Sequence, residues 1–110
     1  MGLPVNTQHT TITSSTAETT ILAAGGTGEF KHIHRLVIAN TSATACVVTI
    51  RDSLAGTIRE VFAVAGGATS GFALPSVDAV GQTTAASAWT ATCGTSVASI
   101  EITVQYVPSR

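Results

Sequence analysis

The sequence predicts an all-β protein that folds as a single antiparallel β-sandwich, jelly-roll-like, of about seven or eight strands. Three observations support this. β-branched residues dominate, with 19 Thr, 11 Val and 8 Ile among 110 residues, and such side chains suit a pleated, half-buried surface. Short runs alternate between apolar and polar residues, which is the period of a strand. No segment combines helix caps with a sufficiently long helical spacing of apolar residues.

The clearest strand is SIEITVQYV at residues 99–107, where an apolar and a polar residue alternate throughout. The same alternation in the other strands predicts which side chains face the core. These residues are Leu36, Ile38, Cys46, Val48, Ile50, Ile58, Phe62, Val64, Phe72, Leu74, Trp89, Ala91, Cys93, Ile100, Ile102, Val104 and Tyr106. A bulge would shift the inward face by one residue, and residues 33–35 and 59–61 are the places where such a shift is most to be expected.

Three connections have a recognisable turn chemistry. LVIANTSATACVVTIRD, residues 36–52, consists of two alternating runs joined by small polar residues and predicts a β-hairpin. LAAGGTGEF at 22–30 and AVAGGATSGF at 63–72 predict corners in which paired glycines turn the chain between strands. The GGTG at 25–28 lacks the following Lys-Ser/Thr and helix of a phosphate-binding loop.

The first 16 residues differ from the rest because they have little to bury. MGLPVNTQ has no apolar period, and HTTITSST is rich in threonine. We therefore expect residues 1–16 to form an extended arm and residues 17–110 to form the sandwich domain. An extended segment can add to an exposed strand edge of another protein. Its candidate partner-binding residues are Val5, Thr10, Ile12 and Thr13.

Charged residues make up 10% of the chain, against about 25% in ordinary soluble domains. Between Val61 and Ile100 the only charged residue is Asp78. The surface is either built from small polar residues or largely covered by partner subunits, and the apolar composition favours the second interpretation. Nucleic-acid binding is not expected, because five scattered basic residues form no basic stripe. Neither a membrane span nor a signal peptide is predicted, so we expect a soluble protein made in a cytoplasm.

No pattern predicts an enzyme or a cofactor. A GxSxG elbow is absent, and Asp52 and Glu60 each follow an arginine, which predicts surface pairing. His32 and His34 are weak metal candidates because residues two apart on a strand point the same way. Against a metal site, the same strand face continues into apolar residues, so one or both rings are expected to be partly buried. Trp89 is expected to fill the core rather than form a ligand platform.

Two cysteines, Cys46 and Cys93, complete the candidates for chemistry. Without an export signal, the expectation is two free thiols in the core. A disulfide would need their strands to be neighbours, and the sequence leaves that open.

RLVIANTSATACVVTIRD, then FAVAGGATSGFALP, then AWTATCG and SIEITVQYV follow one another in an order that resembles the small β-sandwich capsid decoration (cement) proteins of tailed bacteriophages. The resemblance covers roughly residues 18 to 107. It implies a structural protein of the capsid exterior, made in the host bacterial cytoplasm. Its partners would be its own copies, in a homotrimer, and the major capsid protein. The alternatives are a tail, fibre or tip module that binds a host receptor, and a head–tail or tail-completion structural protein.

Overall fold

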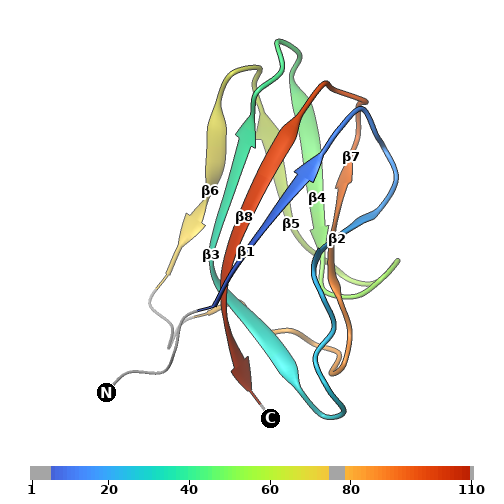
Figure 1. Ribbon diagram of the computed structural model, residues 1–110, viewed down its shortest axis with the longest axis vertical. Helices are drawn as coiled ribbons and strands as arrows, with labels where there is room; N and C mark the ends of the chain where they lie inside the picture. The colour runs from blue at the N-terminus through green and yellow to red at the C-terminus, as the bar shows by residue number, and fades with distance from the viewer. Residues whose placement is uncertain (1–5, 75–78, 110) are drawn as a thin grey trace.

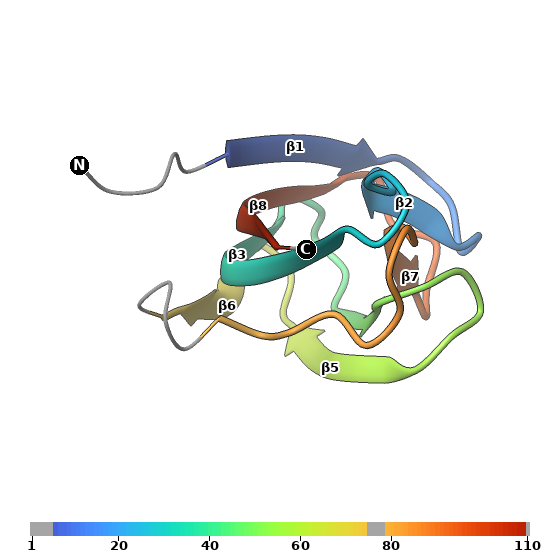
Figure 2. The same ribbon diagram turned by 90° about the horizontal axis from the view of Figure 1, so that it is seen from below.

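The computed structural model describes residues 6–74 and 79–109, which form eight strands and no helix. The strands are β1 Asn6–Ile12, β2 Thr19–Leu22, β3 Phe30–Asn40, β4 Cys46–Arg51, β5 Ile58–Val64, β6 Thr69–Ala73, β7 Trp89–Cys93 and β8 Ile100–Ser109. The first sheet has the order β1-β8-β3-β6 and the second the order β2-β7-β4-β5 (Figure 1). The two antiparallel sheets pack face to face as two layers (Figure 2), which confirms the predicted all-β sandwich.

The strands pair as one long hairpin that has been rolled up. The first strand pairs with the last, β2 pairs with β7, β3 with β6, and β4 with β5. Every connection except the one between β4 and β5 therefore crosses from one sheet to the other. This arrangement is that of a jelly roll.

The hairpin predicted at residues 36–52 is wrong, because β3 and β4 lie in different sheets and do not pair. Asn40 holds the turn between them. Its Nδ2 donates to the carbonyl oxygens of Thr44 at 2.8 Å and Val64 at 3.2 Å, and its Oδ1 accepts from the amide and hydroxyl of Ser42. An alternating strand has the same pattern whether its neighbour lies beside it or faces it across the core, so sequence could not distinguish the two.

The predicted Gly-Gly corners are confirmed, since residues 22–30 join β2 to β3 and residues 63–72 join β5 to β6. In the second corner Gly67 adopts a φ of 74°, a conformation that favours glycine. Its amide donates to the carbonyl of Asn40 at 2.9 Å, which ties this corner to the turn after β3. Two crossings at the same end of the sandwich are thus hydrogen-bonded to each other.

The expected division at residue 16 differs from the structure. Residues Asn6–Ile12 form β1, which pairs with β8 along its whole length, from Asn6 opposite Tyr106 to Ile12 opposite Ile100. Ile12 is buried in the core. Backbone pairing to β8 does not depend on apolar side chains, and threonine is well suited to a strand, which is why this segment joins the sheet despite its weak apolar pattern.

The core lies between the sheets and is built from alternate residues of both. Trp89 is its largest side chain and is 1% exposed, as expected for a core residue; its Nε1 donates to the carbonyl of Lys31 at 2.7 Å. Tyr106, Phe62 and Phe72 pack against the core while partly exposed. The expected inward residues that are at most 3% exposed are Leu36, Ile38, Cys46, Val48, Ile50, Val64, Trp89, Ala91, Cys93, Ile100, Ile102 and Val104.

Two β-bulges occur where the sequence predicted them. In β3 the register against β8 shifts between Ile33 and Arg35. In β5 the extra residue is Arg59, because Ile50 pairs with Glu60 whereas the next residue of β4 pairs with Ile58. A bulge of this kind reverses the facing of every residue beyond it.

Two predicted core residues are exposed instead. Ile58 is 52% exposed, because the Arg59 bulge turns it to the outer face of the second sheet. Leu74 is 37% exposed and follows β6, which ends at Ala73. Both expectations assumed unbroken alternation, which fails at a bulge and beyond a strand end.

The contrast between two isoleucines tests this assignment of faces. Ile38→Ala should lower the free energy of unfolding by about 2–5 kcal/mol, because Ile38 is 0% exposed and its loss leaves a cavity. Ile58→Ala is the matched control and should cost no more than about 1 kcal/mol. Urea unfolding followed by tryptophan fluorescence measures both. Equal losses in the two variants would contradict the placement of Ile58.

Candidate interaction surface

The β4–β5 hairpin carries an exposed apolar surface. Its outer face presents Val47, Ile58, Val61 and Ala63, which we call the hairpin patch. Val47 is 46% exposed and Val61 is 55% exposed, and Leu54 at the tip of the same hairpin is 71% exposed. Four of the five large exposed hydrophobic side chains among the described residues therefore lie on this one hairpin. Clustered exposed apolar side chains mark interaction sites more often than scattered ones do.

A buried ion pair lies at the loop end of the hairpin. Asp52, just after β4, is 0% exposed, and its Oδ2 accepts from Arg59 Nη1 at 2.9 Å. Arg59 also donates to the carbonyl of Gly81, in the connection before β7. The bulge at Arg59 thus places the guanidinium beside Asp52 and turns Ile58 outward. The predicted surface pairing is wrong for Asp52, because the hairpin and the connection before β7 enclose its carboxylate.

Thr83 adds two hydrogen bonds to the same carboxylate oxygen of Asp52 that accepts from Arg59, whereas Asp52 Oδ1 is buried with no hydrogen-bond partner among the described residues. The Thr83 amide and hydroxyl donate to Asp52 Oδ2 at 2.8 and 2.6 Å. Burial alone would raise the pKa of Asp52, but these two hydrogen bonds and Arg59 outweigh it, so the pKa lies below the ordinary value of 3.8. Gln82 adds a further tie, since its Nε2 donates to the Asp52 carbonyl at 2.9 Å. The carboxylate therefore joins the hairpin to the connection before β7.

Glu18 fixes the tip of the hairpin from the other side. Its carboxylate accepts from the Ala55 amide at 2.8 Å and from the Thr90 hydroxyl at 2.5 Å. The Thr90 hydroxyl and then the Ala55 amide lower the pKa of Glu18 from its ordinary value of 4.5. Asp52 and Glu18 thus both hold the loop end of the hairpin, next to Ile58, in place.

A hollow of about 310 Å³ continues from one end of the hairpin patch. Val47 and Ala63 belong to both, and Cys46 lines the hollow. The remaining walls are Ala45, Val64, Ala65 and Thr95. None of these residues is charged, so the hollow extends the apolar character of the hairpin patch to the end of the sandwich.

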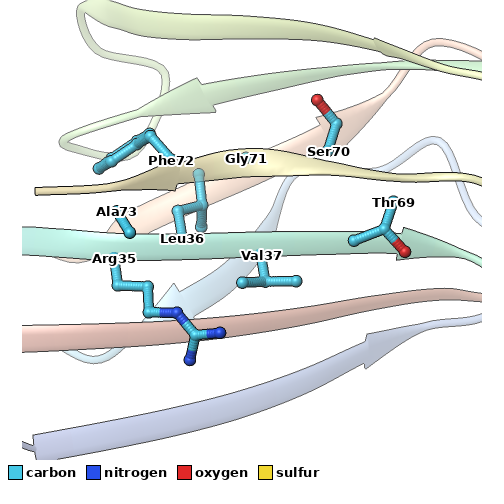
Figure 3. Close-up of a pocket in the computed structure, with 8 residues that line it drawn as sticks. All are labelled: Arg35, Leu36, Val37, Thr69, Ser70, Gly71, Phe72 and Ala73. Atoms are coloured by element: carbon cyan, nitrogen blue, oxygen red, sulfur yellow. The ribbon is translucent and has the colours of Figure 1, made fainter.

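A second hollow, of about 520 Å³, lies over β3 and β6 in the first sheet (Figure 3). Arg35 and Val37 project to one side of β3 and Leu36 to the other. Gly71 lines this hollow and has no side chain to fill it. Its φ is 144°, and a Cβ at this position would collide with the Leu36 carbonyl oxygen, so only glycine fits. Apart from Arg35 its lining is uncharged, and no cluster of acids or histidines meets there.

The outer face of the first sheet carries hydrogen-bonded polar side chains on β1 and β8, unlike the hairpin patch. His9 on β1 contacts two residues of β8, Thr103 Oγ1 at 3.0 Å and Glu101 Oε2 at 3.2 Å. Thr11 donates to the same Glu101 carboxylate at 2.8 Å. These cross-strand pairs fasten β1 to β8, and they distinguish this face from the hairpin patch.

Of the two histidines proposed as weak metal ligands, His32 is held by structural contacts, whereas the buried Nε2 of His34 has no hydrogen-bond partner among the described residues. His32 Nδ1 accepts from the Gln82 amide at 3.1 Å, and its ring stacks on Phe30 with centroids 6.0 Å apart. His34 lies at the bulge between Ile33 and Arg35, which breaks the simple alternation that would align it with His32. Among residues 6–74 and 79–109, no three His, Cys, Asp or Glu side chains come together to hold a metal ion.

The expected partner-binding residues have different surroundings. Ile12 is buried in the core, Thr10 is partly buried in β1, and Thr13 is exposed just beyond the strand. Val5 lies outside the described residues.

The hairpin patch was not predicted from the sequence, because Ile58 was assigned inward. The signal that could have revealed it was the valine pair Val47 and Val61, which fall on the polar phase of their strands. A valine on that phase faces outward, where a polar side chain is usual.

The comparisons with known proteins give the fold. No protein-family model matches the chain, and a search of curated proteins gives no match. A solved structure described as "Bacillus endospore appendages form a novel family of disulfide-linked pili" is similar over 94% of this chain and 87% of that one. Its TM-score is 0.58 at 17% sequence identity. In the part of this chain that the structure describes, no helical segment has the length and apolar character of a membrane span.

The Asp52 site predicts how stability depends on pH. Because the folded-state pKa of Asp52 is lowered, its stabilisation is present above pH 3.8 and is lost as the pH falls through the folded-state value. Asp52→Asn should lower the free energy of unfolding by about 2–4 kcal/mol near neutral pH, since Arg59 loses its buried partner. This deficit should shrink on acidification, as urea unfolding at neutral and acid pH would show.

The control for this experiment is Glu60→Gln, which neutralises an exposed carboxylate on the same hairpin. It should stay within about 0.5 kcal/mol of the wild-type protein near neutral pH. A deficit of Asp52→Asn that is the same at neutral and acid pH would contradict the role assigned to the carboxylate.

Proposed function

We propose that this chain is a non-catalytic structural subunit that coats the outside of a tailed-phage capsid and stabilises it by bridging neighbouring subunits. The hairpin patch is the observation that carries the proposal. An exposed apolar face on a domain with 10% charged residues is suited to being covered by another protein. The sequence resembles those of capsid decoration proteins, and for this reason we propose a capsid as the place where the subunits assemble.

The hairpin patch is assigned to contacts between copies of this chain. β5 is the edge strand of the second sheet, so a neighbouring copy can approach both its apolar face and its backbone edge. Stable protein interfaces bury about 800 Å² on each partner, which the hairpin patch supplies only together with its surroundings. Each additional interface raises the free energy needed to separate the subunits beneath it, which is how a coat resists outward pressure.

The likeness to a pilus protein favours a second candidate, a subunit of a filament. The two proposals differ in symmetry: a decoration protein forms a closed ring such as a trimer, whereas a filament grows by open head-to-tail contacts. The pili of that structure are disulfide-linked, whereas Cys46 and Cys93 of this chain are both buried and offer no exposed thiol for such a link. Non-covalent assembly is therefore proposed for this chain in either case.

Substitution of the hairpin patch tests its role. The triple variant Val47→Thr, Ile58→Thr and Val61→Thr keeps β-branched side chains in the strands but makes the outer face polar. Native mass spectrometry should give a trimer for the wild-type protein and a monomer for the variant, with melting temperatures within a few degrees of each other. Val37→Thr, on the outer face of the first sheet, is the control and should remain a trimer.

The outcome of this experiment separates the candidates. A wild-type series of assemblies that lengthens with concentration favours the filament. A trimer that survives in the triple variant contradicts the assignment of the hairpin patch, and a wild-type monomer contradicts self-assembly in solution. In that last case, binding of the chain to capsids lacking it would have to be measured directly.

A further inference from the structure

The two cysteines lie next to each other in the centre of the second sheet. Cys46 begins β4, Cys93 ends β7, and these two strands pair, with Cys93 opposite Val48. Both thiols face the core, and both are at most 3% exposed. Cys46 is therefore the diagonal neighbour of Cys93 on the same face of the sheet. The sequence left open whether their strands were neighbours.

The Cys46 Sγ lies 3.6 Å from the carbonyl oxygens of Val47 and Thr95, and the Cys46 side chain is near enough to Cys93 to raise the pKa of its thiol. Cα atoms of diagonal neighbours are about 7–8 Å apart, which is at or just beyond the upper limit for a disulfide. Because both side chains lie on the same face of paired strands, closing the bond needs the two strand ends to move closer together.

The two thiols differ in accessibility and reactivity. Cys46 lines the hollow at the end of the hairpin patch, and Cys93 does not. Burial, and then the neighbouring Cys46, raise the pKa of Cys93 to about 11, so that near neutral pH it is almost entirely protonated and reacts slowly. A small reagent that enters the hollow therefore meets Cys46 first.

We propose that Cys46 and Cys93 are an oxidation site, at which a small disulfide converts the two thiols into an intrachain disulfide. The Cys46 thiolate attacks one sulfur of the reagent RSSR, forms a mixed disulfide and releases RS⁻. Cys93 then loses its proton, attacks the Cys46 sulfur and releases the second RS⁻. The chain loses two electrons and two protons, and RSSR becomes two RSH.

The disulfide would be a covalent cross-link that stabilises the fold. It would join the two central strands of the second sheet and close a loop that contains β5, β6 and the connection before β7. Closing a loop of this length restricts the unfolded chain strongly, so the oxidised protein should unfold at a higher temperature, by about 10 °C. This inference does not depend on the proposed assembly.

The test uses the wild-type chain, incubated with glutathione disulfide at about pH 8.5, then alkylated in denaturant and weighed intact by mass spectrometry. The expected product is a monomer that has lost two hydrogen atoms, carries no alkyl group and melts higher than the reduced protein. Dithiothreitol should restore both alkylatable thiols and the lower melting temperature. Two alkylated thiols after full incubation, a persistent glutathione adduct or a disulfide-linked dimer would each overturn the proposal.

Two variants check the order of events. Cys93→Ser should accumulate a stable glutathione adduct on Cys46, because no second thiol resolves it. Cys46→Ser should leave Cys93 unmodified in the folded protein and fully alkylatable after denaturation. An adduct on Cys93 in the second variant would contradict the role of the hollow, while the wild-type result still decides whether the disulfide forms.

Discussion

The pairing of β8 between β1 and β3 is the constraint on which the rest of the sandwich depends. The last strand of the chain occupies an inner position of the first sheet, with the first strand on one side of it. Its inward residues Ile100, Ile102 and Val104 are fully buried. The first sheet therefore cannot be completed until both ends of the chain are in place, which is the long-range topology that makes jelly rolls slow to fold.

The bulge at Arg59 connects a buried polar site to the exposed apolar one. One extra residue in β5 lets the guanidinium reach Asp52 beneath the hairpin and turns Ile58 to the outside. An unbroken strand would bury Ile58 and leave Asp52 without its partner. The same local departure from alternation thus stabilises the hairpin and creates part of the surface that we propose for assembly.

The hairpin patch and the cysteine pair are neighbours at one end of the second sheet. Val47 and Ala63 belong to the hairpin patch and also wall the hollow that gives access to Cys46. A subunit seated on the patch would cover this entrance. Assembly would then keep the thiols, or an existing disulfide, in whichever redox state they had when the subunits came together.

The sequence by itself determined the fold class and the inward faces of β3, β4, β7 and β8, because alternation with period two is a local property. Only the tertiary structure decided that β3 and β4 lie in different sheets, that residues 6–12 pair with β8, and that Cys46 meets Cys93. These features depend on which strands become neighbours. That choice is made by contacts between residues far apart in the chain, and a strand's own pattern of side chains does not record it.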